Sequence, residues 1–470
     1  MTAQTDIAVV GAGPAGMSAA IAAAELGLKV TLIDAYHQPG GQYFKQMPPE
    51  FKAAAKTQQQ KQAELIFGRL AHPNITLFTG TQVWGIYEGR LLTLFGPQAP
   101  PQMQANAVIL ATGAYDRPVT FPGWTLPGVM AAGAAQTMLK SQRVLPGRRV
   151  LVAGSGPLPL ALAASLVWAG AKVAALLEGS SQLARVKPNR LAAIWGQWSR
   201  LTEAAQYGWT LLRARIPYRL GWGVVKALGT ETDGVEGAVI AQLDSGWRPI
   251  PGSEQIIDCD TICLGYGFVP SSELGRLAGA QHVYQPRLGG WLPRRDQMMQ
   301  TTIPGLYVVG DGAGIGGAAQ AAVEGRIAAV AAAQRCRSKE ITGDELANLL
   351  RAELFALRRE KRFQRLYGDL FTPGPGLDEL ATEETIICRC EAIRLAQVND
   401  AVALGAGTLS AVKNLTRAGM GECQGRLCGP LLAAQVARLS GKDRQAVGTL
   451  SPRPPIHPLP LAAVAAGEYA

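Results

Sequence analysis

The chain has little of several residue types that mark common protein classes. Cysteine is scarce, with 7 in 470 residues, and histidine is scarcer, with 4. So few cysteines in a chain of this length exclude a disulfide-stapled secreted scaffold. The histidines show no spacing typical of a metal site or a catalytic triad. The sequence therefore offers no recognisable general base for substrate chemistry.

Charge and long apolar runs are also limited. Charged residues make up 17% of the chain, and 45 basic against 35 acidic residues leave a net charge of +10. Because no long basic run accompanies this mild excess, we expect no nucleic-acid partner. Glycine, proline and lysine interrupt the longest apolar stretch, residues 150–177, and the N-terminus lacks a signal-peptide pattern. We expect a cytoplasmic protein, with peripheral association with the inner membrane as the alternative.

What the chain does contain begins at residues 6–34, which predict a strand, a glycine-rich turn, a helix and a second strand. Gly11, Gly13 and Gly16 form a GxGxxG turn. These glycines allow the tight turn, the close approach of a pyrophosphate and close helix–strand packing. Asp34 follows the second strand, where a carboxylate can accept hydrogen bonds from a ribose. The unit predicts a dinucleotide-binding fold and leaves FAD, NAD and an adenine nucleotide such as ATP open.

Two later segments favour FAD. Residues 107–114 predict a strand that ends at Thr112 and Gly113, and residues 303–325 predict a strand that ends at Gly310 and Asp311. They resemble the flavoproteins related to glutathione reductase, in which the Asp of such a pair holds the ribityl chain of the flavin. The loop 39–42, "PGGQ", resembles the loop after the ribose-binding acid in that family. The resemblance implies an FAD site made of Gly11, Gly13, Pro14, Ala15, Gly16, Asp34, Gly41, Gln42, Val83, Ala111, Thr112, Gly113, Gly310 and Asp311.

A second unit of the same kind covers residues 148–179. Gly154 and Gly156 keep the first two glycines, Pro159 replaces the third, and Glu178 ends the second strand. Proline cannot pack like glycine and has no N–H. We expect the fold to be retained as a degenerate structural domain, and a functional NAD site is the alternative.

A flavin-facing dithiol has little support in this sequence. No cysteine pair follows Gly41, where disulfide reductases of this superfamily carry one. Cys259 and Cys263 are interpreted as small buried hydrophobic residues. Electrons must therefore leave a flavin by another route.

The C-terminal part of the chain concentrates the cysteines. Cys388 and Cys390 form a C-x-C pair, and Cys423 and Cys428 form a glycine-rich C-x4-C pair. A 2Fe–2S cluster needs two thiolates at each iron, which two pairs from two loops supply. Structural zinc and free thiols are the alternatives, and C-x-C is awkward for one tetrahedral ion. Pro430 fits the first position of a helix whose N-terminus would face an anionic cluster.

The sequence of this cysteine module makes the resemblance to known families more specific. It resembles 2Fe–2S domains of the bacterioferritin-associated-ferredoxin type, in which the second pair is usually C-x2-C. The longer pair in "GMGECQGRLC", residues 419–428, together with residues 111–136, resembles the α (flavin/2Fe–2S) subunits of multi-subunit amino-acid and opine dehydrogenases. That group includes opine oxidase, D-hydroxyproline dehydrogenase, hydrogen cyanide synthase and dye-linked proline dehydrogenase.

The resemblance implies an electron-transfer subunit of an oxidoreductase that acts on CH–NH donors and is inactive without its partner. An amino acid or opine would be oxidised on an FAD-containing β subunit. Further expectations are FMN at a subunit interface and a small iron–sulfur γ subunit. The alternatives are a self-contained NADH-dependent flavin/iron–sulfur reductase and a non-catalytic assembly subunit.

These patterns predict an α/β protein with two dinucleotide-binding, glutathione-reductase-like domains and a small α-rich 2Fe–2S domain. Residues 1–116 and 285–340 form the predicted FAD-binding domain, and residues 117–284 the second dinucleotide-binding-like domain. Residues 341–384 are a helix and linker, with an amphipathic helix over 343–371. The predicted 2Fe–2S domain covers 385–445, and a Pro-rich tail covers 446–470.

Overall fold

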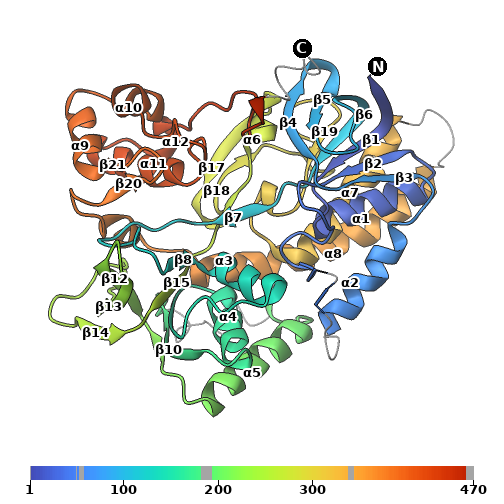
Figure 1. The fold of residues 1–470 in the computed structure, drawn as a ribbon. Helices are drawn as coiled ribbons and strands as arrows, with labels where there is room; N and C mark the ends of the chain where they lie inside the picture. The colour runs from blue at the N-terminus through green and yellow to red at the C-terminus, as the bar shows by residue number, and fades with distance from the viewer. Residues whose placement is uncertain (1, 49, 52–57, 182–192, 337–342, 462–470) are drawn as a thin grey trace. The chain divides into compact units, whose positions relative to one another are not determined.

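The computed structural model describes residues 2–48, 50–51, 58–181, 193–336 and 343–461 (Figure 1). Residues 462–470 of the predicted tail, and residues 337–342 at a predicted domain boundary, lie outside these ranges. The chain divides into two compact units. Unit 1 comprises Met1–Tyr115, Val269–Gln364 and Ser451–Ala470, and unit 2 comprises Asp116–Phe268 and Arg365–Leu450.

Unit 1 is built on a seven-stranded sheet with strand order β3-β2-β1-β6-β5-β4, in which β19 also pairs with β6. Its parallel strands are mostly apolar and buried, apart from the half-buried strand at residues 75–78, as expected for a sheet covered on both faces. They are β1 (Ala3–Val10), β2 (Val30–Ile33), β3 (Ile75–Phe78), β6 (Gln102–Leu110) and β19 (Leu306–Val308). The antiparallel strands are β4 (Gln82–Tyr87) and β5 (Leu91–Phe95).

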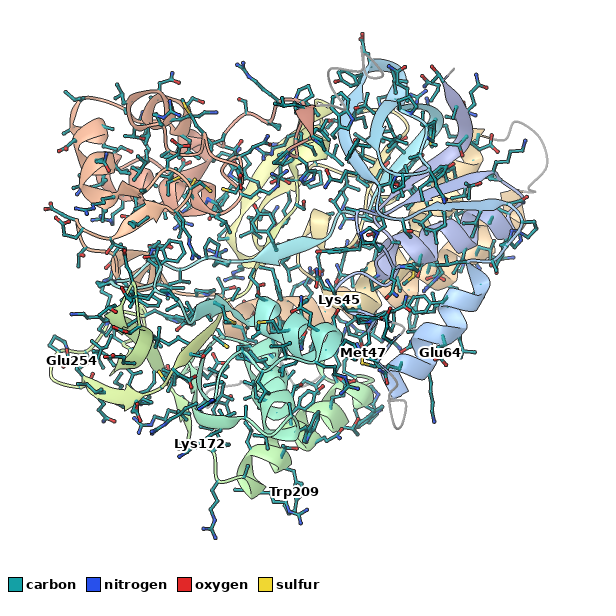
Figure 2. The ribbon with its side chains drawn as sticks, in the orientation of Figure 1. Lys45, Met47, Glu64, Lys172, Trp209 and Glu254 are labelled. Carbon is teal, nitrogen blue, oxygen red and sulfur yellow. The ribbon has the colours of Figure 1, made fainter. Side chains whose placement is uncertain are left out.

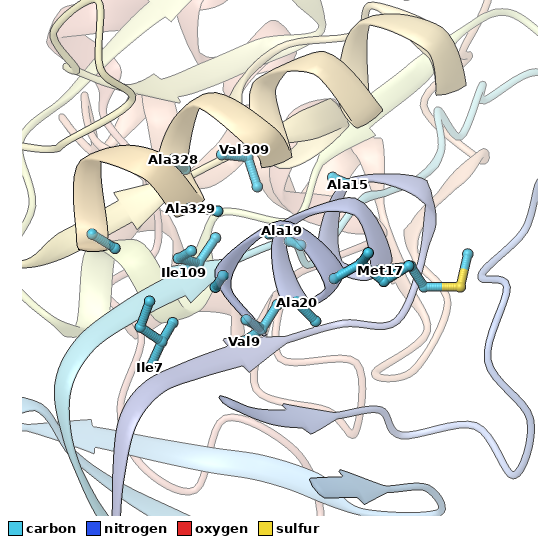
Figure 3. Close-up of a cluster of buried hydrophobic side chains, with 14 of the residues drawn as sticks. Ile7, Val9, Ala15, Met17, Ala19, Ala20, Ile109, Val309, Ala328 and Ala329 are labelled. Carbon is cyan, nitrogen blue, oxygen red and sulfur yellow. The ribbon is translucent and has the colours of Figure 1, made fainter. Parts of the chain in front are cut away.

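Two helices of unit 1 pack closely together over this sheet (Figure 3). They are α1 (Pro14–Glu25) and α7 (Gly317–Cys336), and both are rich in buried alanine. A Cβ at Gly325 of α7 would lie 2.1 Å from the carbonyl oxygen of Ala15, so only glycine allows this approach. The predicted helix over 343–371 is confirmed as α8 (Gly343–Phe371), whose Leu357 is buried in the same core.

The other elements of unit 1 are short, apart from one helix of 12 residues that has an exposed face. They are α2 (Gln58–Arg69), α6 (Glu273–Leu277), β17 (His282–Gln285), β18 (Gly290–Pro293) and the 3-10 turn Gly310–Ala313. Strands β7 (Ala114–Asp116) and β16 (Phe268–Pro270) fall at the unit boundaries in the sequence.

Unit 2 contains a second parallel sheet, with strand order β11-β10-β9-β15-β8. The predicted strand–turn–helix–strand unit is present as β9 (Arg149–Gly154), α4 (Pro157–Trp168) and β10 (Lys172–Glu178). Around it lie β8 (Val129–Ala131), α3 (Ala132–Thr137), α5 (Trp198–Arg213), β11 (Tyr218–Leu220) and β15 (Thr261–Gly265). An antiparallel sheet adds β12 (Trp222–Thr230), β13 (Gly234–Gln242) and β14 (Gln255–Asp258).

The cysteine-containing segment of unit 2 forms a small helical module with its own core. Val398, Val412, Leu432 and Val436 are buried at its centre. Its elements are β20 (Ile386–Cys388), β21 (Ile393–Arg394), α9 (Leu395–Ala403), α10 (Leu409–Thr416), α11 (Cys428–Ser440) and α12 (Arg444–Val447). Because α11 begins at Cys428, Pro430 lies within the first turn and not at the predicted first position.

In the part of the chain that the structure describes, no helix is both long enough and apolar enough to cross a membrane.

Candidate cofactor sites

The first glycine-rich turn leaves room only at its second glycine. A Cβ at Gly11, whose φ is +105°, would lie 2.3 Å from the Ala111 carbonyl oxygen, and one at Gly16 would lie 1.7 Å from that of Gly11. A Cβ at Gly13 would meet nothing closer than Gly41 Cα at 4.0 Å. The first-turn N–H groups of α1 thus face a surface where an anion can approach.

The carboxylate at the end of β2 is fixed beside this turn. Asp34 is 6% exposed; its Oδ2 accepts a hydrogen bond from the Ala12 N–H at 2.5 Å, and its Oδ1 accepts one from the Tyr36 N–H at 2.7 Å. Burial raises its pKa, and the two N–H donors and Lys45 act in the opposite direction. A carboxylate has about four acceptor positions, so Asp34 keeps capacity for a ribose hydroxyl.

Two side chains that complete this corner, those of Tyr36 and Lys45, were not among the residues predicted from the sequence. The ammonium of Lys45, a residue that Figure 2 labels, lies 4.1 Å from the centroid of the Tyr36 ring. Lys45 also interacts electrostatically with Asp34. Gln42 Nε2 donates to the Tyr36 hydroxyl at 3.0 Å. The position of Tyr36, two residues after the acid, was the available sequence signal.

The structure brings the loop 39–42 to the turn and leaves the Val83 side chain elsewhere. The Gly40 N–H donates to the Ala12 carbonyl at 2.8 Å. The Val83 side chain is buried in the core of the sheet. The residue just before its strand, Thr81, donates its N–H to the Asp34 carbonyl at 2.9 Å, so the backbone there is tied to that of the acid.

A second carboxylate stands at the same edge of the sheet. The Oδ1 of Asp311 accepts hydrogen bonds from the Gly316 and Gly317 N–H groups at 2.9 and 3.0 Å, and burial raises its pKa. In the described part of the chain these bonds leave its Oδ2 for a ligand hydroxyl. A Cβ at Gly312 would lie 3.1 Å from Thr112 Oγ1, so the ends of β6 and β19 meet here. Ligands bind at this carboxyl edge in open α/β sheets, and the glycine cradle with its two carboxylates fits a dinucleotide.

The second glycine-rich turn is filled by the chain itself. A Cβ at Gly156, whose φ is +100°, would lie 2.5 Å from the hydroxyl oxygen of Tyr367 on α8. The Gly156 N–H already donates to Glu178 Oε2 at 2.9 Å. Pro157 and Pro159 remove two further N–H groups from the first turn of α4. Few donors therefore remain for a pyrophosphate.

Further contacts tie the end of α8 to this turn. The hydroxyl of Ser180 donates to the Leu370 carbonyl at 2.6 Å. Glu178 is 3% exposed, and burial raises its pKa to about 7 against the N–H donors of Ser180 and Gly156. Pro159 packs against Gly154, where a Cβ would lie 2.6 Å from its Cγ. The proline thus fills the space that the third glycine would leave.

All four predicted cysteine ligands come together in unit 2. The Cys428 thiol contacts those of Cys388 and Cys423, and Cys423 also contacts Cys390. Contact with Cys428 lowers the pKa of Cys388 to about 6 and that of Cys423 to about 4, and the same contacts raise the pKa of Cys428. Within the described ranges, no three His, Cys, Asp or Glu side chains are arranged around a single metal ion.

The loops around the thiols are shaped for this approach. A Cβ at Gly421 would lie 2.3 Å from Cys390 Cβ, so glycine is required there. Cys388 and Cys428 are buried, and Cys390 is exposed. Cys428 is the first residue of α11, where the helix dipole favours a thiolate. The donor set, two thiols from each loop, fits a cluster held by four thiolates.

Comparison with known proteins places these sites in context. The Pyridine nucleotide-disulphide oxidoreductase family matches residues 5–335, and the Sarcosine oxidase A3 domain matches residues 382–468. Hydrogen cyanide synthase subunit HcnB of Pseudomonas aeruginosa is 34% identical over 97% of this chain and 97% of its own length. An opine oxidase subunit of Rhizobium meliloti is 32% identical, covering 98% of this chain and 87% of its own. The structure of L-proline dehydrogenase from P. horikoshii shares the fold, with a TM-score of 0.66 at 22% identity over 98% of this chain and 79% of that one.

Proposed function

Because this chain belongs to the pyridine nucleotide-disulphide oxidoreductase family, and to the group of hydrogen cyanide synthase subunit HcnB and its opine oxidase counterpart, we propose that it is the electron-transfer subunit of a heteromeric amino-acid or opine dehydrogenase. The family makes it a flavoprotein oxidoreductase. In the proposal, FAD is held at the Gly11–Gly16 turn, and a 2Fe–2S cluster is held by Cys388, Cys390, Cys423 and Cys428.

The gathering of the four thiols is the observation that carries this proposal. A flavin takes up an electron pair, and an iron–sulfur cluster passes electrons singly. In this chain, Asp34 and Asp311 would orient the dinucleotide through its hydroxyl groups. The thiols of Cys388 and Cys428 would anchor the buried side of the cluster, and exposed Cys390 would mark the side that faces an electron acceptor.

The proposed partner is an FAD-containing β subunit, on which the amino acid or opine is oxidised. Two relatives, hydrogen cyanide synthase subunit HcnB and an opine oxidase subunit, are subunits by name, and this supports a multi-subunit assembly. The same proposal includes a cytoplasmic location, FMN at a subunit interface and a small iron–sulfur γ subunit.

The alternative of a self-contained NADH reductase needs a working second nucleotide site. The Tyr367 hydroxyl over Gly156 and the two prolines of the α4 first turn argue against such a site. An assembly subunit without redox function would purify without flavin, and this distinguishes the third possibility.

Metal analysis of two cysteine variants tests the cluster. Anaerobically purified protein should contain about two irons and two sulfides per chain, with the EPR signal of a reduced 2Fe–2S cluster. Cys423→Ser should lose iron, because a hydroxyl is a poor substitute for a thiolate. Cys336→Ser, outside the cluster, should keep the iron content. Stoichiometric zinc without iron would refute the assignment.

Activity of the chain with and without its partner tests the division of labour. The isolated chain should neither oxidise amino acids or opines nor be reduced rapidly by NADH, whereas the complex should oxidise substrate with an artificial dye. In the complex, Cys423→Ser should still let substrate reduce the partner's flavin in a single turnover. Substrate oxidation by the chain alone at the rate of the complex would contradict the proposed division.

A further inference from the structure

Unit 2 exposes large apolar side chains along one helix, α5, in the part of the chain that the structure describes. Trp198 is 59% exposed, Leu201 41%, Trp209 66% and Leu212 70%. Figure 2 labels Trp209 on this helix. Single exposed apolar residues are ordinary, but a contiguous apolar patch marks an interaction surface.

The opposite side of α5 is already docked on unit 2. Leu211 is 3% exposed and lies in the core to which α4 contributes Leu162 and Leu166. The ring centroid of Tyr207 lies 5.9 Å from that of Trp168, the last residue of α4. The docked side therefore fixes the helix, and the exposed tryptophans are left for a second contact.

The exposed side chains follow a spacing that reads the same in both directions. Steps of 3, 4, 4 and 3 residues separate them, which at 3.6 residues per turn keeps them within an arc of about 80°. We call them the α5 stripe, and they are Trp198, Leu201, Ala205, Trp209 and Leu212. Ala205 is exposed as well, and the stripe is symmetric about it.

A second copy of the stripe complements the first when the two helices run antiparallel. About a two-fold axis at Ala205, Trp198 faces Leu212 of the other copy, and Leu201 faces Trp209 of the other copy. Each tryptophan then packs against a leucine. The two small Ala205 side chains meet at the axis and let the helices approach closely.

The charges of the helix agree with this register. Arg213 borders the stripe and would face Gln197 of the other copy, whereas helical periodicity directs Arg200 and Glu203 away from the stripe. No like charges face each other, so nothing electrostatic opposes the pairing. A membrane-surface helix has a polar face rich in Lys and Arg, but the polar side of α5 packs on α4. A second copy therefore fits the stripe better than a lipid surface does.

The exposed area is close to what a stable dimer needs. Trp195 is 76% exposed, and its ring centroid lies 5.5 Å from that of Trp198, so it extends the stripe. A buried tryptophan hides roughly 150–250 Å², so the exposed fractions of Trp195, Trp198 and Trp209 amount to about 300–500 Å² per copy. Stable interfaces bury about 600–1,000 Å² per partner. Leu201 and Leu212 supply much of the remainder.

We propose that the α5 stripe is the surface through which two copies of this chain associate, with the two-fold axis at Ala205. Both copies use the same residues, so the contact is closed and leaves no stripe for a third copy. The dimer does not depend on the proposed electron transfer, because it involves neither the flavin turn nor the four cysteines.

Sedimentation velocity of the full, cofactor-loaded chain over a range of concentrations tests the association. The chain should sediment as a dimer. Ala205→Glu brings two carboxylates together at the axis and should raise the Kd of the dimer roughly 100-fold or more. Leu404→Glu changes a residue of unit 2 that is 79% exposed and outside the stripe, and it should leave the Kd unchanged. A monomeric chain, or a dimer that Ala205→Glu does not weaken, overturns the proposal.

Single cysteines on the helix test the register. Ala205→Cys should form a disulfide between two copies under mild oxidation, because residues at the axis meet their own counterparts. Arg213→Cys should not, since its counterpart would lie roughly 24 Å away along the paired helices at 1.5 Å per residue. A non-reducing gel gives the result, with the unchanged chain as the background from native thiols.

Two outcomes contradict the register or the partner. Equal crosslinking of Ala205→Cys and Arg213→Cys, or crosslinking of neither, overturns the two-fold axis at Ala205. A monomeric chain that binds anionic phospholipid vesicles and loses this binding in Ala205→Glu would identify a membrane as the partner of the stripe, and this too overturns the proposal.

Discussion

The two glycine-rich turns of this chain have the same local fold, but the first is open to a ligand and the second is covered by another side chain. Each joins a buried strand to a helix and has a carboxylate at the end of the next strand. Over Gly13 the nearest atom to a Cβ would be Gly41 Cα at 4.0 Å, whereas over Gly156 it would be the Tyr367 hydroxyl at 2.5 Å. The glycines of such a motif therefore report the geometry of a turn. Whether a ligand can reach it depends on distant segments.

The carboxylates beside the two turns, Asp34 and Glu178, also differ in whether they leave the turn available to a ligand. Asp34 accepts from the N–H of Ala12, the residue between the glycines, and Glu178, one methylene longer, accepts from the second glycine itself. Lys45 offsets the burial of Asp34, whereas no cation among the described residues offsets the burial of Glu178. The second turn thus has internal replacements for contacts that a nucleotide would make.

Among the substitutions that test this difference between the turns, one at Gly13 should have the largest effect, which is on FAD affinity. Gly13→Asp leaves the backbone unstrained, because the φ of Gly13 is −76°, and it puts a carboxylate where the pyrophosphate would lie. Like charges in such contact cost several kcal/mol, so FAD affinity should fall roughly 100-fold or more. Flavin absorbance after desalting measures the occupancy. Full occupancy in this variant would move the FAD site away from the first turn.

The matched change in the second turn should act on stability and leave flavin in place. Gly156→Ala forces a side chain into a φ of +100° and against Tyr367, at an expected cost of about 1–3 kcal/mol in the free energy of unfolding. Denaturant unfolding gives the loss, and flavin occupancy is the internal control. Loss of flavin with unchanged stability would reverse the roles of the two turns.

The sequence predicted what depends on local pattern. Both strand–turn–helix–strand units and the bounds of α8 follow from spacing alone, because each is set within one segment. Tyr367 over Gly156 could not be predicted, since no local pattern links residues so distant in the chain. Pro159 was interpreted as damage to packing, but it packs well, and the loss of N–H donors at Pro157 and Pro159 is the greater change.

A pH-dependent effect of intermediate size is expected from Glu178. Burial raises its pKa from 4.5 to about 7, so the folded state prefers the neutral acid. Its stabilising contribution is complete below the ordinary value and is lost as pH rises through about 7, by about 1–3 kcal/mol. Glu178→Gln should flatten this fall between about pH 5 and pH 8. The measurement is the denaturation midpoint at both pH values, and an equal slope in both proteins contradicts the assignment.

The smallest effect is expected from Tyr367→Phe, which asks how many features close the second turn. The change removes the hydroxyl above Gly156 and keeps the ring, whose centroid lies 5.0 Å from that of Phe371. The free energy of unfolding should fall by about 1 kcal/mol or less, the net worth of one hydrogen bond. NADH should still not bind, because Pro157 and Pro159 lack N–H groups and Glu178 holds the Gly156 N–H. Titration of NADH fluorescence against both proteins tests this expectation. Saturable NADH binding in the variant alone would show that a single hydroxyl separates the two turns, and that the prolines and Glu178 do not.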